Sequence, residues 1–295
     1  MVRLLAQFAP AKINLFLRVV GRRPDGYHQL DSIFVPISLR DRVAIELRPS
    51  DKVSIRMRCE GASVPLDDRN LAWCAAAAFM REFSVAAEVL IDLRKEIPVG
   101  AGLGGGSSDA GAVLRMMAAL YRIDAGKRLA TVALGLGADV PFFLDARPAR
   151  VGGIGEKIVP LASMPVLHLV IAAPPIEVST AAVFRALTPD SWSGPAPDAD
   201  LCAIAAGHFE SSALVNDLEP VAIRICPRIA QLKTMLCGLG ASAAAMTGSG
   251  GAVFGVFPGA EEAACAARAG RLRAPDSRFF AASSIGGQEV AGAQD

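Results

Sequence analysis

The most informative part of this chain is the stretch Pro98-Val-Gly-Ala-Gly-Leu-Gly-Gly-Gly-Ser-Ser-Asp109. Glycines let backbone N–H groups approach an anion closely, and a helix N-terminus adds unpaired donors and a partial positive charge. Apolar residues follow at the i, i+3, i+4 and i+7 spacing of an amphipathic helix, namely Val113, Met116, Met117 and Leu120. The stretch therefore predicts a phosphate-binding loop. Its expected ligand-binding residues are Pro98, Val99, Gly100, Ala101, Gly102, Leu103, Gly104, Gly105, Gly106, Ser107 and Ser108.

Length and patterning indicate an α+β protein of two domains. The chain has 295 residues, above the usual size of one domain, and 52% of them are hydrophobic. We expect an N-terminal domain over residues 1–160, a C-terminal domain over 161–285 and a frayed tail over 286–295. The Gly/Pro-rich segment 146–165 is expected to link the domains, and residues 188–200 to form an exposed loop.

Charge and cysteine content argue against several classes of protein. The chain carries 30 Lys and Arg against 29 Asp and Glu, which gives no electrostatic case for nucleic acid. The sequence has no polybasic block and no apolar run of about 18 residues, so neither feature points to a membrane. Six cysteines without CxxC or Cys/His clusters fit reduced thiols. We therefore expect a cytoplasmic protein, with no particular oligomeric state indicated.

Alternating apolar residues predict the early strands. They are expected over 11–20, 33–39, 43–47, 53–57 and 89–93, with another over 166–172. Helical spacing predicts a helix capped by Asn70 and helices over 128–137, 220–226, 229–236 and 260–273. In the first strand, Lys12 and Asn14 face away from Ile13 and Leu15. A second glycine cluster lies within 243–257, between strand-like flanks.

Three other kinds of loop compete for residues 98–109. A Walker A loop needs a Lys after its last glycine, and none follows Gly106. Gly100, Gly102 and Gly105 do satisfy the Gly-x-Gly-x-x-Gly of a dinucleotide-binding fold, and Asp124 follows about 20 positions on. That aspartate comes directly after the loop helix, however, with no second strand to place it at a ribose. A plain glycine-rich turn would not require paired serines and a helix at that offset.

The loop resembles the ATP loop of the galactokinase, homoserine kinase, mevalonate kinase and phosphomevalonate kinase (GHMP) superfamily. Three further segments resemble one branch of it, namely Pro10–Leu17 followed by Gly26-Tyr-His28, Gly137–Phe143 and Met246–Phe254. The resemblance implies a two-domain GHMP-kinase fold with the active site in the cleft between the domains. It implies ATP and Mg²⁺ as cofactors and a cytidine diphosphate-linked sugar alcohol as substrate. In that branch the 2-hydroxyl of the methylerythritol unit is phosphorylated, in the non-mevalonate route to isoprenoids.

The resemblance assigns catalysis to Asp139 and Lys12. Asp139 stands in an otherwise apolar run and would accept the proton of the substrate hydroxyl; a simple turn aspartate is the alternative. Lys12 would pair with it and keep it ionised, whereas a solvated strand lysine is the alternative. Asn14, on the same face as Lys12, would help to fix the site by hydrogen bonding.

The same resemblance places the cytidine end at Tyr27 and His28. An aromatic ring and an imidazole can stack on cytosine and bond to its edge. Phe184 would cover the other face with Thr180 near it, although core packing also explains Phe184. The glycine cluster would bring backbone close to substrate phosphate through Gly248, Ser249 and Gly250.

Two further groups keep more than one interpretation. Ser107 and Ser108 can cap the helix, reach phosphate, or do both, with Ser108 a candidate for the magnesium that arrives with ATP. No carboxylate pair or His cluster suggests a metal held by the protein alone. Lys95 can approach the nucleotide or be solvated.

Rival functions follow from the same residues. Another kinase of the superfamily, acting on homoserine or mevalonate, disagrees with the Gly-Tyr-His and Gly-Ala-Asp-Val-Pro segments. A non-catalytic sensor disagrees with the presence of both Lys12 and Asp139. An NAD(P)-binding oxidoreductase is the third rival.

Overall fold

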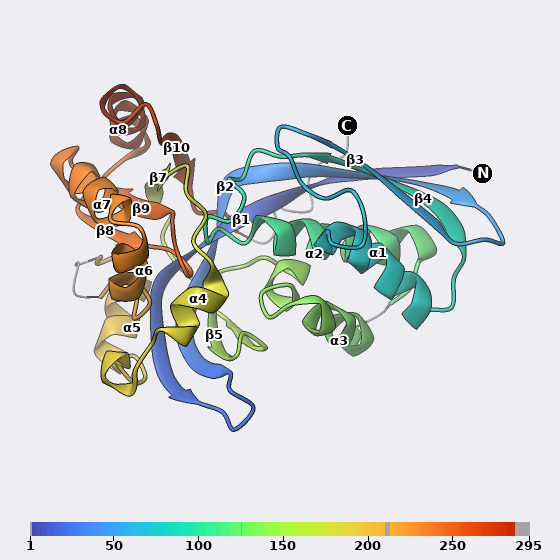
Figure 1. The fold of residues 1–295 in the computed structure, drawn as a ribbon, viewed down its shortest axis with the longest axis horizontal. Helices are drawn as coiled ribbons and strands as arrows, with labels where there is room; N and C mark the ends of the chain where they lie inside the picture. The colour runs from blue at the N-terminus through green and yellow to red at the C-terminus, as the bar shows by residue number, and fades with distance from the viewer. Residues whose placement is uncertain (1, 125, 210–212, 287–295) are drawn as a thin grey trace.

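The computed structural model describes residues 2–124, 126–209 and 213–286, which fold around two β-sheets (Figure 1). The first sheet is six-stranded, in the order β3-β4-β2-β5-β6, with β1 paired to β2. Only β3 and β4 run parallel, with a helix crossing between them. The strands are β1 (Arg3–Arg22), β2 (His28–Pro49), β3 (Ser54–Glu60), β4 (Ala87–Arg94), β5 (Ala149–Gly153) and β6 (Lys157–Pro160).

The long hairpin of β1 and β2 replaces the shorter strands expected from the sequence. The separate strands over 33–39 and 43–47 are wrong, because Arg40 and Asp41 continue the ladder opposite Pro10 and Ala9. Register shifts interrupt β1, including one between Asn14 and Leu17. Both faces of its middle are buried, since the hairpin contributes to the cores of both halves of the molecule.

Two helices cover one face of the first sheet, and a third packs on those two (Figure 1). They are α1 (Leu71–Glu82), α2 (Gly105–Tyr121) and α3 (Gly126–Leu136). Asn70 caps α1 as expected, its Oδ1 accepting a bond from Ala72 N at 2.9 Å. The predicted apolar face of α2 is also confirmed, because Val113, Met116 and Met117 are fully buried.

The second sheet is four-stranded and antiparallel, in the order β10-β7-β9-β8. Its strands are β7 (His168–Ala173), β8 (Ala243–Met246), β9 (Val253–Phe257) and β10 (Arg278–Ser283). Helix α7 packs on β8 and β9, and α8 packs on β7 and β10 (Figure 1). The helices of this half are α4 (Thr180–Arg185), α5 (Asp198–Ala205), α6 (Glu219–Ile225), α7 (Arg228–Gly238) and α8 (Ala260–Arg273).

Two segments are more structured than expected. Residues 146–165 contain the hairpin β5–β6, so most of this supposed link belongs to the first sheet. Residues 188–200 contain a 3₁₀ turn and the start of α5. Backbone N–H groups of this segment donate hydrogen bonds to the carboxylates of Asp217 and Asp31 and so fix its position.

The chain changes sheet between Pro160 and His168. This change supports the proposed domain limits of 1–160 and 161–285, although β1 and β2 also pack into the second half. Of the expected tail 286–295, all but Gly286 lies outside the described residues. Within the described ranges, no helix has the length and apolar character needed to cross a membrane.

Candidate active site

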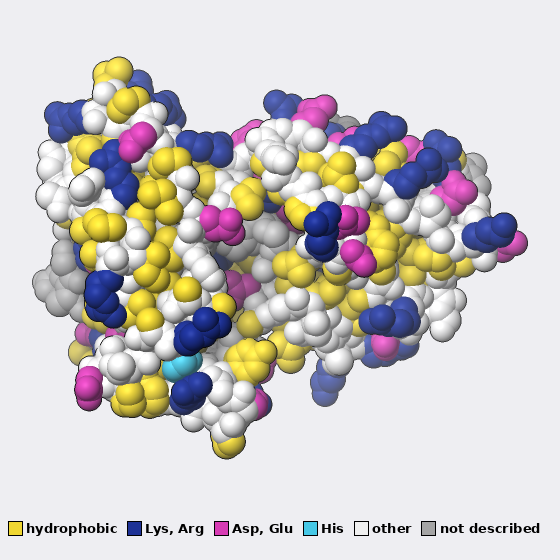
Figure 2. Space-filling model, viewed as in Figure 1, with side chains coloured by type: hydrophobic (Ala, Val, Ile, Leu, Met, Phe, Trp, Pro, Cys, Tyr) yellow, Lys and Arg dark blue, Asp and Glu magenta, His cyan; other side chains and the backbone are white. Residues whose placement is uncertain are grey.

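A cleft of about 630 Å³ lies between the two halves of the molecule. Figure 2 shows both lobes and the hollow between them, with charges of both signs interspersed on the visible face. Twelve of the predicted site residues line this cleft, namely Lys12, Asn14, Tyr27, His28, Gly102, Gly104, Ser107, Asp139, Thr180, Phe184, Gly248 and Ser249. Predicted residues off its wall are Pro98, Val99, Gly100, Ala101, Leu103, Gly105, Gly106, Ser108 and Gly250.

Lys12 and Asp139 meet at the wall of the cleft. Lys12 Nζ lies 3.5 Å from Asp139 Oδ2 and donates to Asn14 Oδ1 at 2.7 Å. The lysine is only 3% exposed, which rules out a solvated strand lysine. The Asp139 side chain keeps 32% of its surface exposed, so a ligand can reach it. The pair joins β1 to the turn before the 3₁₀ helix Pro141–Leu144.

Asn14 connects the first strand to the second glycine turn. Its Oδ1 accepts a bond from Gly248 N at 2.9 Å, and its Nδ2 donates to Ser32 Oγ at 2.9 Å. Its backbone N–H donates to Thr247 Oγ1 at 3.0 Å. A buried amide with this many partners holds Lys12 and the 248 turn in one fixed geometry.

The two glycine turns pack directly on one another. Gly102 has φ +79°, and a Cβ there would stand 2.5 Å from Thr247 O. Gly248 has φ +58°, and a Cβ there would stand 2.7 Å from Gly102 O. Both positions therefore require glycine for conformation and for space. Backbone bonds fix the contact, since Lys12 N donates to Leu103 O and Ala252 N donates to Ala101 O.

The serines at the start of α2 do not cap the helix. The N-cap position is Gly104, in the left-handed region with φ +72°, and Ser107 and Ser108 lie within the first turn. Ser107 lines the cleft, whereas Ser108 is fully buried and its Oγ has no hydrogen-bond partner. The capping interpretation is thus wrong, and the free N–H groups of the helix end stay available to an anion.

An aromatic group forms the other end of the cleft. The His28 and Phe184 rings lie 5.3 Å apart and tilted by 31°, and Thr180 Oγ1 is 2.6 Å from Ser249 Oγ beside them. Partial burial, and then the charge of Arg22, lowers the pKa of His28. The imidazole is therefore mainly neutral at pH 7 and offers one donor and one acceptor. Tyr27 stands 61% exposed at the rim.

Sequence reasoning missed several residues that shape this site. Trp192 packs edge-on against His28, with ring centroids 6.0 Å apart. Asp217 anchors the segment that carries Trp192, because its carboxylate accepts hydrogen bonds from Ser193 N at 2.9 Å and from Val19 N at 2.7 Å. Asn216 Nδ2 donates to Gly248 O at 2.9 Å. The signal was a polar Asn-Asp pair between Val215 and Leu218, because buried polar residues need such partners.

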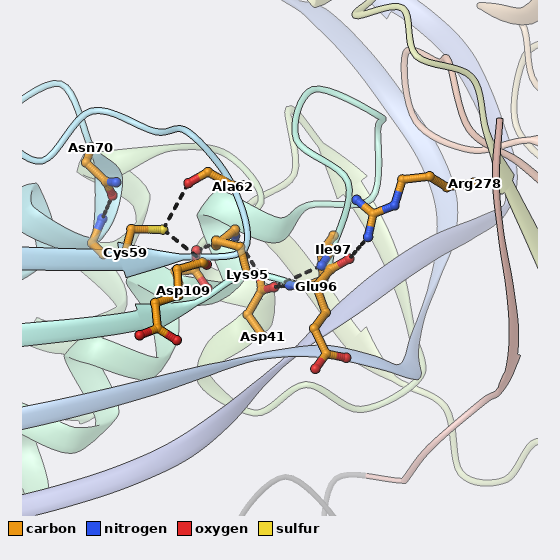
Figure 3. Close-up of polar contacts among 11 residues, drawn as sticks. Asp41, Cys59, Ala62, Asn70, Lys95, Glu96, Ile97, Asp109 and Arg278 are labelled. Carbon is orange, nitrogen blue, oxygen red and sulfur yellow. Dashed lines mark hydrogen bonds and ion pairs between the residues drawn. The ribbon is translucent and has the colours of Figure 1, made fainter. Parts of the chain in front are cut away.

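Lys95 is neither solvated nor part of the cleft wall. It is 7% exposed and forms ion pairs with Asp41 and Asp109, two residues that the sequence analysis did not single out (Figure 3). Lys95 lies behind the phosphate loop, where its ion pairs can hold the loop in place.

Comparison with known proteins agrees with this geometry. Residues 70–146 match the GHMP kinases N terminal domain, and residues 200–273 match the GHMP kinases C terminal model. The fold and the cleft are thus those of a GHMP kinase. A homoserine kinase from Cytophaga hutchinsonii shares the fold at a TM-score of 0.73 and 18% identity, covering 96% of this chain and 95% of that one.

Other relatives are more specific. The 4-diphosphocytidyl-2-C-methyl-D-erythritol kinase of Geobacter metallireducens is 42% identical over 88% of this chain and 92% of its own. That of Anaeromyxobacter dehalogenans is 42% identical over 92% and 86%. A crystal structure of 4-(cytidine 5'-diphospho)-2C-methyl-D-erythritol kinase superimposes with a TM-score of 0.79 at 38% identity, covering 96% of this chain and all of that chain.

This chain therefore belongs to the 4-diphosphocytidyl-2-C-methyl-D-erythritol kinase family of the GHMP kinases. Membership confirms the expected ATP-dependent kinase and contradicts the NAD(P)-binding oxidoreductase. It also makes the homoserine and mevalonate kinases relatives in fold alone, at 15–18% identity.

Proposed function

We propose that this chain transfers the γ-phosphate of ATP to the 2-hydroxyl of 4-diphosphocytidyl-2-C-methyl-D-erythritol, in the non-mevalonate route to isoprenoids. One observation carries the proposal. A Lys12–Asp139 pair lies in the same cleft as the start of a glycine-led helix and an imidazole–aromatic pair. The substrate is the one for which the relatives are named, and the cleft contains groups suited to each of its parts.

The reaction needs a base, a positive charge and an aligned hydroxyl. The 2-hydroxyl oxygen attacks the γ-phosphorus while the bond from that phosphorus to the β–γ bridging oxygen breaks and ADP leaves. Asp139 accepts the hydroxyl proton. Lys12, paired with that carboxylate, stabilises negative charge developing on the attacking oxygen. Asn14 holds Lys12 in place through the 2.7 Å bond.

The phosphate loop and α2 are proposed to hold the nucleotide phosphates. Ser107 faces the cleft at the helix N-terminus, so it is better placed than the buried Ser108 to reach phosphate or magnesium. Magnesium bound with ATP neutralises charge on the phosphates. No group of three His, Cys, Asp or Glu side chains suited to a metal occurs among the residues with a described placement. The cation is therefore proposed to enter with the nucleotide.

The cytidine end is proposed to lie against His28 and Phe184. A mainly neutral imidazole matches the mixed donor and acceptor edge of cytosine, and Tyr27 at the rim can close over the base. Thr180, Gly248, Ser249 and Gly250 are proposed to guide the diphosphate towards Lys12. Both ligands are small molecules, and since ATP is one of them we propose a cytoplasmic location.

An ADP-release assay with a substrate panel tests the proposal. We expect ADP release with 4-diphosphocytidyl-2-C-methyl-D-erythritol and none above background with mevalonate or homoserine. Turnover of mevalonate or homoserine in place of the cytidine compound would overturn the substrate assignment. If none of the three substrates gave ADP release and the protein bound NADH, the assignment as a kinase would be overturned.

A further inference from the structure

The two ends of the phosphate loop are joined by a buried ionic cluster. Lys95, just before the loop, places its Nζ 2.5 Å from Asp41 Oδ2 and 2.6 Å from Asp109 Oδ2 (Figure 3). Asp109 lies on the first turns of α2, so the Lys95–Asp109 bond spans the whole loop. Asp41 is fully buried and Asp109 is 2% exposed. Water therefore competes little for these bonds.

Asp41 also replaces the hydrogen bonds that the sheet cannot supply. The ladder between β2 and β4 ends at the Arg42–Arg94 pair. Beyond it, Asp41 Oδ1 accepts from Glu96 N at 2.6 Å and Ile97 N at 2.9 Å. One carboxylate thus directs the chain out of β4 and into Pro98, the first residue of the loop.

The loop entry and the helix start touch each other directly. A Cβ added at Gly105 would stand 3.0 Å from Ile97 Cγ2 and 3.4 Å from Lys95 Nζ. A shift of either end would therefore move the other. Burying two carboxylates around one ammonium is costly, so the cluster is weak evidence for a purely stabilising role.

We propose that Asp41 and Asp109 are positioning residues for ATP, which act through Lys95 to set the span between Ile97 and α2. The nucleotide-binding conformation of residues 98–104 follows from that span. This inference rests on the proposed function only in taking the loop as the nucleotide site.

An isosteric substitution at Asp41 tests positioning apart from side-chain size. In Asp41→Asn either orientation of the amide turns its N–H groups towards other donors, Lys95 on one side or Glu96 and Ile97 on the other.

The experiment measures ADP affinity by calorimetry and KM for each substrate. For Asp41→Asn we expect the ADP Kd and the ATP KM to rise by about tenfold. The KM of the cytidine substrate should stay within about twofold of wild type, because its site lies across the cleft. Asp92→Asn, at an exposed acid on β4 outside the cluster, should stay within about threefold of wild type in ADP affinity. Thermal melts report folding, and if Asp41→Asn does not fold, Asp109→Leu takes its place with the same expected result.

Unchanged ADP affinity in the folded variant would overturn the inference. So would an equal change in the KM of both substrates, which is the pattern of a general structural defect. A wild-type protein that binds no ADP would instead overturn the proposed function.

Discussion

At the residue scale, the Lys12–Asp139 pair shows how burial turns an ordinary strand lysine into a catalytic candidate. Lys12 is committed to Asn14 and Asp139 at the inner wall, while Asp139 keeps about a third of its side chain open to the cleft. A base has to be reachable by its substrate, and its cation has to be held in place. The partly exposed Asp139 side chain suits the base, and the buried Lys12 side chain suits the cation.

Asp139→Asn removes the proposed proton acceptor but preserves side-chain size. We expect kcat to fall by about 10²–10⁴-fold, the usual range for loss of a general base. ADP affinity should persist, because the phosphate loop is untouched. Activity assays measure kcat, and calorimetry measures the affinity for ADP. Asp145→Asn, at a nearby exposed acid, is the control, and near-normal kcat in Asp139→Asn would refute the assignment.

Asp109 predicts a pH dependence of stability. Burial raises its pKa to about 7, although the Lys95 ammonium opposes this and Asp41 adds to it; the Cys59 thiol is the other titratable group nearby. A carboxyl with a raised folded-state pKa favours folding when protonated, so its contribution is full below about pH 4 and is lost as pH rises towards 7.

Melting temperatures from pH 5 to pH 8 check this dependence. Wild type should lose stability relative to Asp109→Asn as pH rises, because the asparagine never ionises. A constant difference between the two proteins across that range would show that Asp109 does not titrate there.

At the scale of elements, the active site depends on contacts between turns that are far apart in sequence. The loop at 98–104 and the turn at 247–251 meet through Gly102 and Gly248, and Asn14 binds the second turn from β1. The two glycine clusters were visible in the sequence. Their direct contact was not, because it depends on how the two sheets come together.

Gly248→Ala would insert a methyl group into this contact. With φ +58° and only 2.7 Å to Gly102 O, the substitution should cost about 1–3 kcal/mol of unfolding free energy and slow turnover. Urea denaturation measures the cost. Gly135→Ala, where nothing lies within 4 Å of the added Cβ in helix α3, is the control and should be neutral or stabilising. Equal effects at both positions would contradict the packing argument.

The segment 188–197 contacts the proposed cytidine end through Trp192, whose ring packs edge-on against His28. Trp192→Leu should raise the KM of the cytidine substrate by about threefold to tenfold, the worth of one edge-to-face aromatic pair, and leave the ATP KM unchanged. Since Trp73 is the other of the two tryptophans, Trp73→Phe leaves Trp192 as the sole indole. Its emission should change with the cytidine substrate and not with ADP. A change in emission with ADP alone would contradict the placement of Trp192 at the cytidine end.

At the scale of the whole molecule, local patterns predicted the elements and a resemblance predicted how they assemble. The α2 helix and the Asn70 cap follow from residues close in sequence. The continuous β1–β2 hairpin did not, because separate strands were expected on either side of the charged Arg40-Asp41-Arg42 stretch, and the burial of Asp41 against Lys95 depends on tertiary neighbours. Trp192 and Asn216 were missed for the same reason, since their roles depend on tertiary neighbours.

In the proposed reaction, this cleft transfers the γ-phosphate of ATP to the 2-hydroxyl of a cytidine diphosphate sugar alcohol. Phosphorus NMR of the reaction of ATP with 4-diphosphocytidyl-2-C-methyl-D-erythritol detects this transfer. We predict one new phosphomonoester signal, coupled to the 2-position, with the diphosphate signals of the substrate intact. A monoester at another hydroxyl, or ATP consumed with no monoester formed, would contradict it.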